Sequence, residues 1–163
     1  MKKMLLLLLL VLLSGCAVNQ VDIDVYNNDW YSIDVPEGWI VAEAEEGRIV
    51  SLLSDGEEFV NIIIEVEETN LGLGQVWLEE KERLERSELM VGTQQLQETT
   101  TTLDTEIAYS VTYEYFLGEA LKAEEIVAVH SGNSFIVTLQ SAEGVFNSEY
   151  ATFEASLNSF EFN

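Results

Sequence analysis

Apolar residues recur at every second position in part of the C-terminal half of the chain, which is the period of a β-strand. The longest such run predicts a strand over residues 107–115. Its expected apolar side consists of Ile107, Tyr109, Val111, Tyr113 and Tyr115. Residues 126–130 and 135–140 are apolar on both sides and predict two fully covered strands around a turn at 131–133. We therefore expect several neighbouring strands in this half of the chain.

Residues 74–90 change to the period of 3.6 residues that is typical of an amphipathic helix. The apolar side of this helix is expected to consist of Leu73, Val76, Trp77 and Leu84. Two pairs of opposite charge are spaced i,i+4 on the other side, namely Glu79 with Arg83 and Glu82 with Arg86. Because such pairs suit a helix surface in contact with water, we expect the outer side to be solvated.

A second helical stripe lies close to the C-terminus. Its members follow at i, i+4, i+7, i+11 and i+14, and they are Phe146, Tyr150, Phe153, Leu157 and Phe160. Four aromatic rings on one side of a helix offer a large apolar area for packing. We expect a C-terminal helix that packs against the sheet with this whole stripe.

The beginning of the domain predicts two short strands. Residues 30–35 alternate apolar and polar side chains, as a half-buried strand does. The Pro-Glu-Gly sequence at 36–38 then turns the chain, and residues 39–41 begin a second strand. Neither strand is long enough to be stable without the remainder of the sheet.

A hairpin follows these strands. Residues 49–53 and 59–66 are strand-like, and Asp55 with Gly56 between them suits the positive φ angles of a tight turn. Strands joined mostly by hairpins, together with two long helices, predict a single α+β domain with an antiparallel sheet rather than repeated βαβ units. No internal repeat or second domain boundary is evident in the sequence.

The N-terminal segment has the layout of a lipoprotein signal. Two lysines precede an apolar run of ten residues, which is too short to cross about 30 Å of hydrocarbon as a helix. The run ends in Leu13-Ser14-Gly15-Cys16, which resembles the prokaryotic lipobox at all four positions. This resemblance implies cleavage between Gly15 and Cys16 and lipid attachment to Cys16. The alternatives are an ordinary cleaved secretory signal and an uncleaved anchor.

The signal divides the chain into three parts. Residues 1–15 form the signal peptide, residues 16–28 the lipidated N-terminus and a flexible tether, and residues 29–163 the folded domain. Cys16 is the only cysteine, so an internal disulfide cannot form and stability must come from a packed core. The expected location is the extracytoplasmic face of a membrane in the cell envelope.

The charge of the chain narrows the choice of partners. The full sequence carries 7 Lys and Arg against 30 Asp and Glu, a formal net charge of −23. Removal of residues 1–15 takes away two lysines and no acid, which leaves a net charge of −25. Without clustered bases to neutralise phosphates, nucleic acid is not an expected partner. Anionic headgroups also repel such a chain, so membrane binding must depend on acyl chains at Cys16.

Two short motifs resemble a known family. Residues 31–39 read Tyr-Ser-Ile-Asp-Val-Pro-Glu-Gly-Trp, which is similar to the "F-x-(V/I)-x-(Y/V)-P-x-G-W" opening of PsbP-like domains. The matching residues are Tyr31, Pro36, Gly38 and Trp39. Residues 153–160 are similar to the last helix of the family and end in the Ser-Phe pair that contains Phe160. Over residues 29–163 the chain therefore resembles the PsbP/Mog/DcrB superfamily.

This resemblance implies an antiparallel sheet sandwiched by helices, with the motif residues serving in packing. Members of the superfamily are extracytoplasmic lipoproteins or extrinsic subunits that bind partner proteins, and they are not recognised catalysts. Photosystem subunit P is tied to calcium and manganese retention. The acidic composition of this chain departs from a form that docks through lysines, so that role is not carried over.

Few residues point to catalysis. His130 is the only histidine, with Ser131 and Ser134 close by, but no G-x-S-x-G sequence surrounds either serine. We interpret His130 as a residue at the end of a strand rather than as a catalytic base. A zinc site is not expected either, because one histidine and one lipid-committed cysteine cannot supply three or four ligands.

Carboxylates offer one candidate cation site. Asp55, Glu57 and Glu58 lie at the expected hairpin tip, where side chains can converge on calcium or manganese. The spacing of a calcium-binding loop is absent, and a hydrated acidic surface explains the same residues. No cofactor is therefore expected, with calcium or manganese as the alternative.

Three functions follow in order of preference. The first is a membrane-anchored, non-catalytic module that binds or helps to assemble an unidentified membrane or envelope protein. The second is a lipoprotein that binds a divalent cation or a small ligand. The third is a hydrolase, which would require a cleft that holds His130 with a serine or paired acids.

Overall fold

The structure of the protein is a computed structural model that describes residues 24–55, 59–87 and 97–163. The described elements, in chain order, are β1 (Val25–Asn27), β2 (Tyr31–Asp34), β3 (Ile40–Ala44), the 3-10 helix η1 (Glu45–Gly47), β4 (Ile49–Leu53), β5 (Asn61–Glu68), α2 (Leu73–Glu85), β6 (Gln97–Leu103), β7 (Glu106–Phe116), β8 (Ala120–His130), β9 (Asn133–Ala142), α3 (Phe146–Asn158) and β10 (Glu161–Phe162). Helices and strands are thus mixed along the chain, as the sequence pattern predicts.

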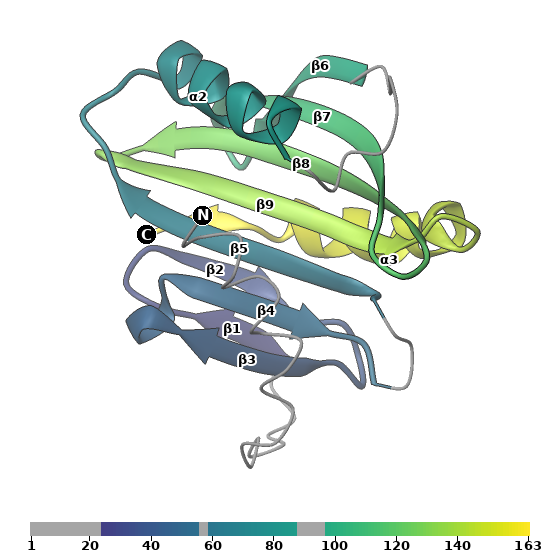
Figure 1. The fold of residues 1–163 in the computed structure, drawn as a ribbon. Helices are drawn as coiled ribbons and strands as arrows, with labels where there is room; N and C mark the ends of the chain where they lie inside the picture. The colour runs from purple at the N-terminus through teal and green to yellow at the C-terminus, as the bar shows by residue number, and fades with distance from the viewer. Residues whose placement is uncertain (1–23, 56–58, 88–96) are drawn as a thin grey trace.

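Two antiparallel sheets organise the described residues (Figure 1). The larger sheet has seven strands in the order β3-β4-β5-β9-β8-β7-β6, and the smaller has three in the order β1-β2-β10. Every pair of neighbouring strands is antiparallel. The α+β class with an antiparallel sheet is confirmed, although one sheet was expected and two are present.

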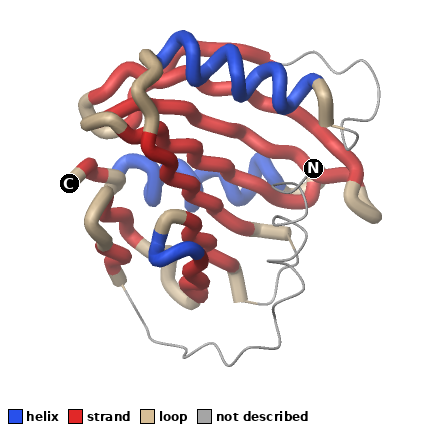
Figure 2. The backbone as a smooth tube through the Cα atoms, turned by 60° about the vertical axis from the view of Figure 1, so that its left-hand side comes forward, coloured by secondary structure: helices blue, strands red, loops and turns tan. Residues whose placement is uncertain are grey.

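The two long helices lie on opposite sides of the seven-stranded sheet (Figure 2). The apolar residues of α2 pack on β7 and β8. Helix α3 packs on the other face, which the small sheet also covers. The sheet is thus covered on both sides, as expected from the resemblance to helix-flanked sheets.

The predicted hairpin and the long alternating strand are both confirmed. Strands β4 and β5 pair in the register Ile49↔Glu65, and their connecting residues 56–58 lie outside the described residues. Along β7, Val111 is fully buried on the side that faces α2, and Ala108 is fully buried on the opposite side. Ile107, at the start of the strand, is 63% exposed and does not join the core.

Strand β8 is longer than its apolar run suggests. It begins at Ala120, six residues before the expected start at residue 126. Leu121 and Ala123 are fully buried, so buried residues alternate along this part of the strand. The charged residues Lys122, Glu124 and Glu125 hide the alternation in the sequence. The additional residues pair with β7 and β9, so the central strands of the sheet are longer than the sequence pattern predicts.

The main core lies between the seven-stranded sheet and the layer of α3 with the small sheet. It contains the largest fully buried side chains, among them Tyr31, Phe135, Phe153 and Phe160. Burying one such ring contributes about 1.5–3 kcal/mol relative to leaving it in water. Because the chain has a single cysteine, this apolar layer must supply the stability that disulfides give to many small secreted domains.

The C-terminal stripe was only partly predicted. Phe146 and Phe153 are buried under α3, but Tyr150 is 37% exposed. The helix ends at Asn158, so Phe160 lies beyond it, in the connection to β10. Ser159 explains this exit, because its hydroxyl accepts a hydrogen bond from the backbone N–H of Asp34 at 2.8 Å and ties the chain to β2. The expectation of one continuous helical stripe was wrong at its end.

The tether was also predicted too long. Residues 16–28 were expected to be flexible, but Val25–Asn27 form β1 and pair with β2. Tyr26 is buried at 4% exposure and packs against Tyr31, which holds the segment in place. No helix among residues 24–55, 59–87 and 97–163 is long and apolar enough to cross a bilayer.

Candidate functional site

The residues of the first motif form part of the aromatic core. Tyr31 is fully buried and stacks on Phe160, with ring centroids 5.1 Å apart and planes inclined by 14°. Phe135 meets both rings edge to face. Burial raises the pKa of the Tyr31 hydroxyl far above its ordinary value, so this group stays protonated. Tyr31 and Phe160 thus join the beginning and the end of the domain.

Trp39 and Gly38 position the turn between the two sheets. Trp39 contacts Phe153 of α3 edge to face, with ring centroids 6.3 Å apart. Gly38 has φ of +78°, a conformation that side-chain-bearing residues rarely adopt. The turn needs glycine for its backbone and tryptophan for its contact with the helix. Trp39 thus packs on α3, whereas Gly38 contributes its backbone conformation.

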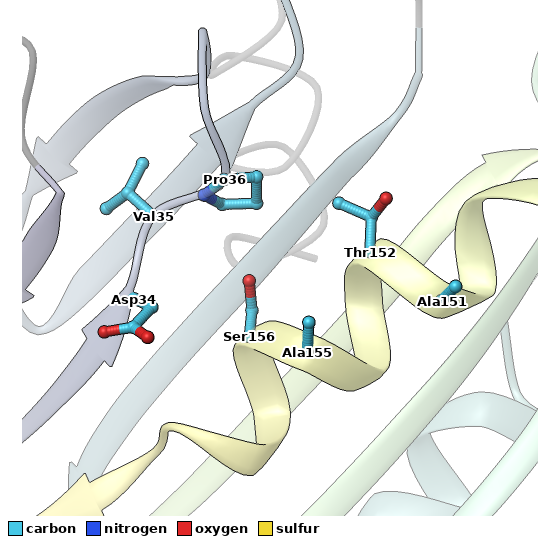
Figure 3. Close-up of a pocket in the computed structure, with 7 residues that line it drawn as sticks. All are labelled: Asp34, Val35, Pro36, Ala151, Thr152, Ala155 and Ser156. Carbon is cyan, nitrogen blue, oxygen red and sulfur yellow. The ribbon is translucent and has the colours of Figure 1, made fainter.

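A groove lies next to this turn, between the end of β2 and α3 (Figure 3). Its volume is about 400 Å³, and it is open to solvent. The lining residues are Asp34, Val35, Pro36, Ala151, Thr152, Ala155 and Ser156. Small side chains on this side of α3 leave room beside the helix. Pro36 forms part of the opposite wall of the groove.

The groove carries little charge. Val35 and Ser156 are buried in it, whereas Ala151 and Ala155 are exposed at its surface. Asp34 is the only ionisable residue in the lining. Most of the surface lining the depression is therefore apolar. Its chemistry suits an apolar side chain with a basic group nearby.

A second group of polar side chains lies on the other face, beneath α2. Glu80 of α2 and Glu125 of β8 are only 6% and 1% exposed. Arg83 bridges them: its Nε donates to Glu80, and its guanidinium donates to Glu125 Oε2 at 3.0 Å. The hydroxyl of Tyr113 lies 3.4 Å from the same oxygen. We refer to Glu80, Arg83, Tyr113 and Glu125 as the carboxyl cluster.

The environment of the carboxyl cluster favours a protonated acid. Burial raises the pKa of Glu125 well above its ordinary value, and Glu80 raises it further, while Arg83 lowers it. Burial also raises the pKa of Tyr113, with Glu125 as the next cause. Tyr113 therefore stays neutral and can donate a hydrogen bond to the acid.

The sequence pattern assigned the partners of Arg83 incorrectly. It predicts an exposed pair with Glu79, but Arg83 turns inward to Glu80 and Glu125. The predicted pair of Glu82 with Arg86 is confirmed, at 2.7 Å. A signal for Glu80 does exist, because it lies four residues from both Val76 and Leu84 and thus on the apolar side of the helix.

His130 is not arranged as a catalytic base with a serine. Its Nδ1 lies 2.9 Å from Glu106 Oε1, and its ring stacks on Phe162 with centroids 4.5 Å apart. Ser134 instead donates to the carbonyl oxygen of Glu67. The ring of His130 thus closes the edge of the aromatic core.

The candidate cation site stays a prediction. Asp55 is exposed, whereas Glu57 and Glu58 lie outside the described residues. Within the described parts of the chain, no three His, Cys, Asp or Glu side chains gather in a way that could hold a metal ion. Gly15 and Cys16 also lie outside the described residues, so lipidation stays a prediction as well.

The fold defines a class: an α+β domain in which helices and a small sheet cover both faces of a long antiparallel sheet. No protein-family model and no curated protein sequence matches the chain. Solved structures do match it. Cyanobacterial PsbP (CyanoP) from Synechocystis sp. PCC 6803 aligns with a TM-score of 0.61 and 17% identity, over 93% of this chain and 99% of that protein. The chain thus has the PsbP-like fold that its motifs predict.

Two further structures have the same arrangement. LpqN, described as involved in cell envelope biogenesis of Mycobacterium tuberculosis, aligns with a TM-score of 0.59 and 11% identity, over 82% of this chain and 83% of that protein. A protein from Bacteroides thetaiotaomicron VPI-5482 aligns with a TM-score of 0.62 and 12% identity, over 88% of this chain. The alignment covers 49% of the Bacteroides protein, about half of its length. At these identities the likeness shows the fold alone.

Proposed function

We propose that this protein is a lipid-anchored, non-catalytic interaction module on the extracytoplasmic face of a membrane. In this proposal the groove beside α3 binds a segment of a membrane or envelope protein. The groove itself is the observation that carries the proposal: about 400 Å³ of open space, mostly lined by small and apolar side chains. Such a depression can receive a protruding side chain of a partner.

Charge supports a partner of a particular kind. A net charge of −23 repels acidic proteins and attracts basic ones over about one Debye length. Asp34 at the groove can pair with a Lys or Arg of the partner, while Val35 and Ala155 contact an apolar residue next to it. The expected ligand is therefore an apolar residue flanked by a basic one.

The anchor supports the location. The lipobox ending at Cys16 supplies acyl chains, and confinement to a membrane raises the local concentration of neighbouring membrane proteins. The envelope role in the description of LpqN belongs to that protein, and the fold that it shares with this chain is a further basis on which we propose an envelope location.

Site-specific photo-cross-linking tests the interaction in cells. A photoreactive residue at Ala151 faces the groove, and the same residue at Glu82 of α2 is an exposed control on the opposite face. We expect one defined membrane partner to be captured from position 151 and not from position 82. Equal capture from both positions would contradict binding in the groove.

Two substitutions sharpen this experiment. Ala155→Trp fills the groove from an exposed position, so it should remove the cross-link and leave the thermal midpoint nearly unchanged. Asp34→Lys should weaken the same cross-link by reversing the charge at the rim. The matched control for this change of charge is Glu154→Lys. Glu154 is exposed on α3 and does not line the groove.

The anchor needs a separate test. Cys16→Ser removes the lipid-accepting sulfur, so the protein should move from the membrane fraction to the soluble fraction, and labelled fatty acid should no longer be incorporated. If the variant stays in membranes with unchanged labelling, Cys16 is not the anchor. This result would leave the groove untouched, because the two tests read different parts of the chain.

A further inference from the structure

The carboxyl cluster contains an unsatisfied oxygen. Glu125 Oε1 is buried and has no hydrogen-bond partner among the described residues, although Oε2 accepts from Arg83 and Tyr113. A buried acceptor without a partner is costly, by about 1–3 kcal/mol for a neutral group and more for a charged one. Arg83 donates to both Glu80 and Glu125, so the two buried carboxyls share one guanidinium. Two ionised carboxylates only accept, so a hydrogen bond between them would require a proton.

The charges around Glu125 lead to the same conclusion. Helix α2 contributes Glu80 and Arg83, strand β7 contributes the neutral Tyr113, and Glu65 on β5 adds a further negative charge at longer range. With both buried acids ionised, one guanidinium faces two carboxylates. One proton on the pair balances the charge and satisfies Oε1 in a single step.

We infer that Glu80 and Glu125 together bind one proton, and that this shared proton holds α2 against the sheet. The proton lies between α2, which carries Glu80, and β8, which carries Glu125. Loss of this proton leaves two carboxylates facing each other across the interface between the helix and the sheet. Under this inference, the site is a proton-binding site built into the packing of α2. It does not depend on the proposed function of the groove.

The helix has attachments besides the cluster, among them the ion pair of Lys81 with Glu98 and the stack of Trp77 on Tyr109. Its buried side chains besides Glu80 are Val76, Trp77 and Leu84. Gly72 precedes the helix and gives no side-chain hydrogen bond to its first turn. The apolar cluster under α2 has fewer buried residues than the main core, and Glu80 and Glu125 are buried beside it. Opening of α2 should therefore respond to protonation more than opening of α3.

The direction of the pH effect follows from linkage. Burial and Glu80 raise the pKa of Glu125 in the folded protein above its ordinary value in the unfolded chain. The stability contributed by the proton is fully present below the ordinary pKa of a glutamate, near 4.5, and is lost as the pH rises through the folded pKa. Packing of α2 should weaken from mildly acidic to alkaline pH.

Carbon-13 NMR of the side-chain carboxyls tests the proton directly. The full chain is titrated in detergent micelles from pH 4 to pH 9, with Glu80→Gln and Glu125→Gln used to assign the two signals. We expect the Glu125 signal to titrate above the ordinary range of a glutamate carboxyl, and Glu80→Gln to lower that titration because a neighbouring negative charge is removed. If Glu125 titrates in the ordinary range, or if Glu80→Gln leaves its titration unchanged, the inference fails.

Hydrogen exchange tests the consequence for the helix. Protection of α2 amides, corrected for intrinsic exchange, should fall at least tenfold more than that of α3 amides between pH 6 and pH 8.5. Glu125→Gln keeps the shape of the side chain without the charge, so the additional loss should disappear. Glu82→Gln, an exposed change on the same helix, should retain the additional loss of α2 protection. Equal pH dependence of α2 in wild type and Glu125→Gln would overturn the link to packing.

Discussion

The two faces of the seven-stranded sheet are packed by different means. On the α3 face, Tyr31, Phe135 and Phe160 contact one another from three elements far apart in the sequence. On the α2 face, a smaller apolar group shares the interface with Glu80 and Glu125, the two buried charged residues of the described chain. One face is stabilised by contact area, and the other also depends on charge.

This difference separates what the fold requires from what it tolerates. The central rings of the aromatic face, Tyr31, Phe135 and Phe160, carry no ionised group, so their packing should depend little on pH. Buried carboxylates cost desolvation energy, and well-packed apolar residues in their place are often neutral or stabilising. The aromatic face therefore explains why the chain folds, whereas the carboxyl cluster makes one helix sensitive to its surroundings.

The largest effect is expected from breaking the aromatic face. Phe153→Ala removes a fully buried ring that contacts Trp39 and Phe146, so it should lower the free energy of unfolding by about 3–5 kcal/mol. Chemical denaturation of the full chain measures the loss. Tyr150→Ala, on the same helix but 37% exposed, is the control and should cost much less. Similar losses for both would mean that α3 packs with Tyr150 inward.

The next effect is expected from removing the cation beneath α2. Arg83→Met leaves two buried carboxyls without their guanidinium, and should cost about 2 kcal/mol at pH 8. The loss should be smaller at pH 5, where the acids can take up protons. Arg86→Met removes an exposed pair with Glu82 and should change stability by less than about 0.5 kcal/mol. A loss for Arg83→Met that is independent of pH would point to lost packing alone.

A third change tests the turn that leads into the aromatic face. Gly38→Ala places a Cβ in open space, since no atom lies within 4 Å of it, but φ of +78° strains any residue with a side chain. The expected cost is about 1–2 kcal/mol, from the backbone alone. Gly144→Ala, also in open space but without a positive φ, should cost almost nothing. Thermal unfolding of both variants compares them. If Gly38→Ala is as stable as wild type, the turn does not need its left-handed conformation.

The sequence predicted the aromatic face better than the charged one, for a physical reason. Packing leaves a period in the sequence, as the spacing of Phe146 and Phe153 shows. The partners of a buried charge leave none: Glu124 and Glu125 are adjacent, yet Glu124 accepts from Ser110 on one face while Glu125 lies beneath α2 on the other. Only the register of β8 decides which of the two is buried.

The groove could not be predicted for a related reason. Its walls come from residues 34–36 and 151–156, which meet only after the small sheet and α3 have packed. Alanine and serine are ordinary residues in any helix, so the types of Ala151, Ala155 and Ser156 carry no signal. Pro36 was recognised as part of a motif, but its place beside an open groove depends on the tertiary structure.

The smallest effect is expected at the rim of the aromatic face, where His130 and Glu106 form a partly exposed contact. Glu106→Gln removes the carboxylate beside His130, but the two side chains are 41% and 28% exposed, so water replaces the contact. The free energy of unfolding should change by less than about 1 kcal/mol at pH 6, as measured by chemical denaturation. The stack of His130 on Phe162 should persist, because it depends on ring contact. A loss as large as that of Arg83→Met would show that charge matters on both faces and would remove the contrast between them.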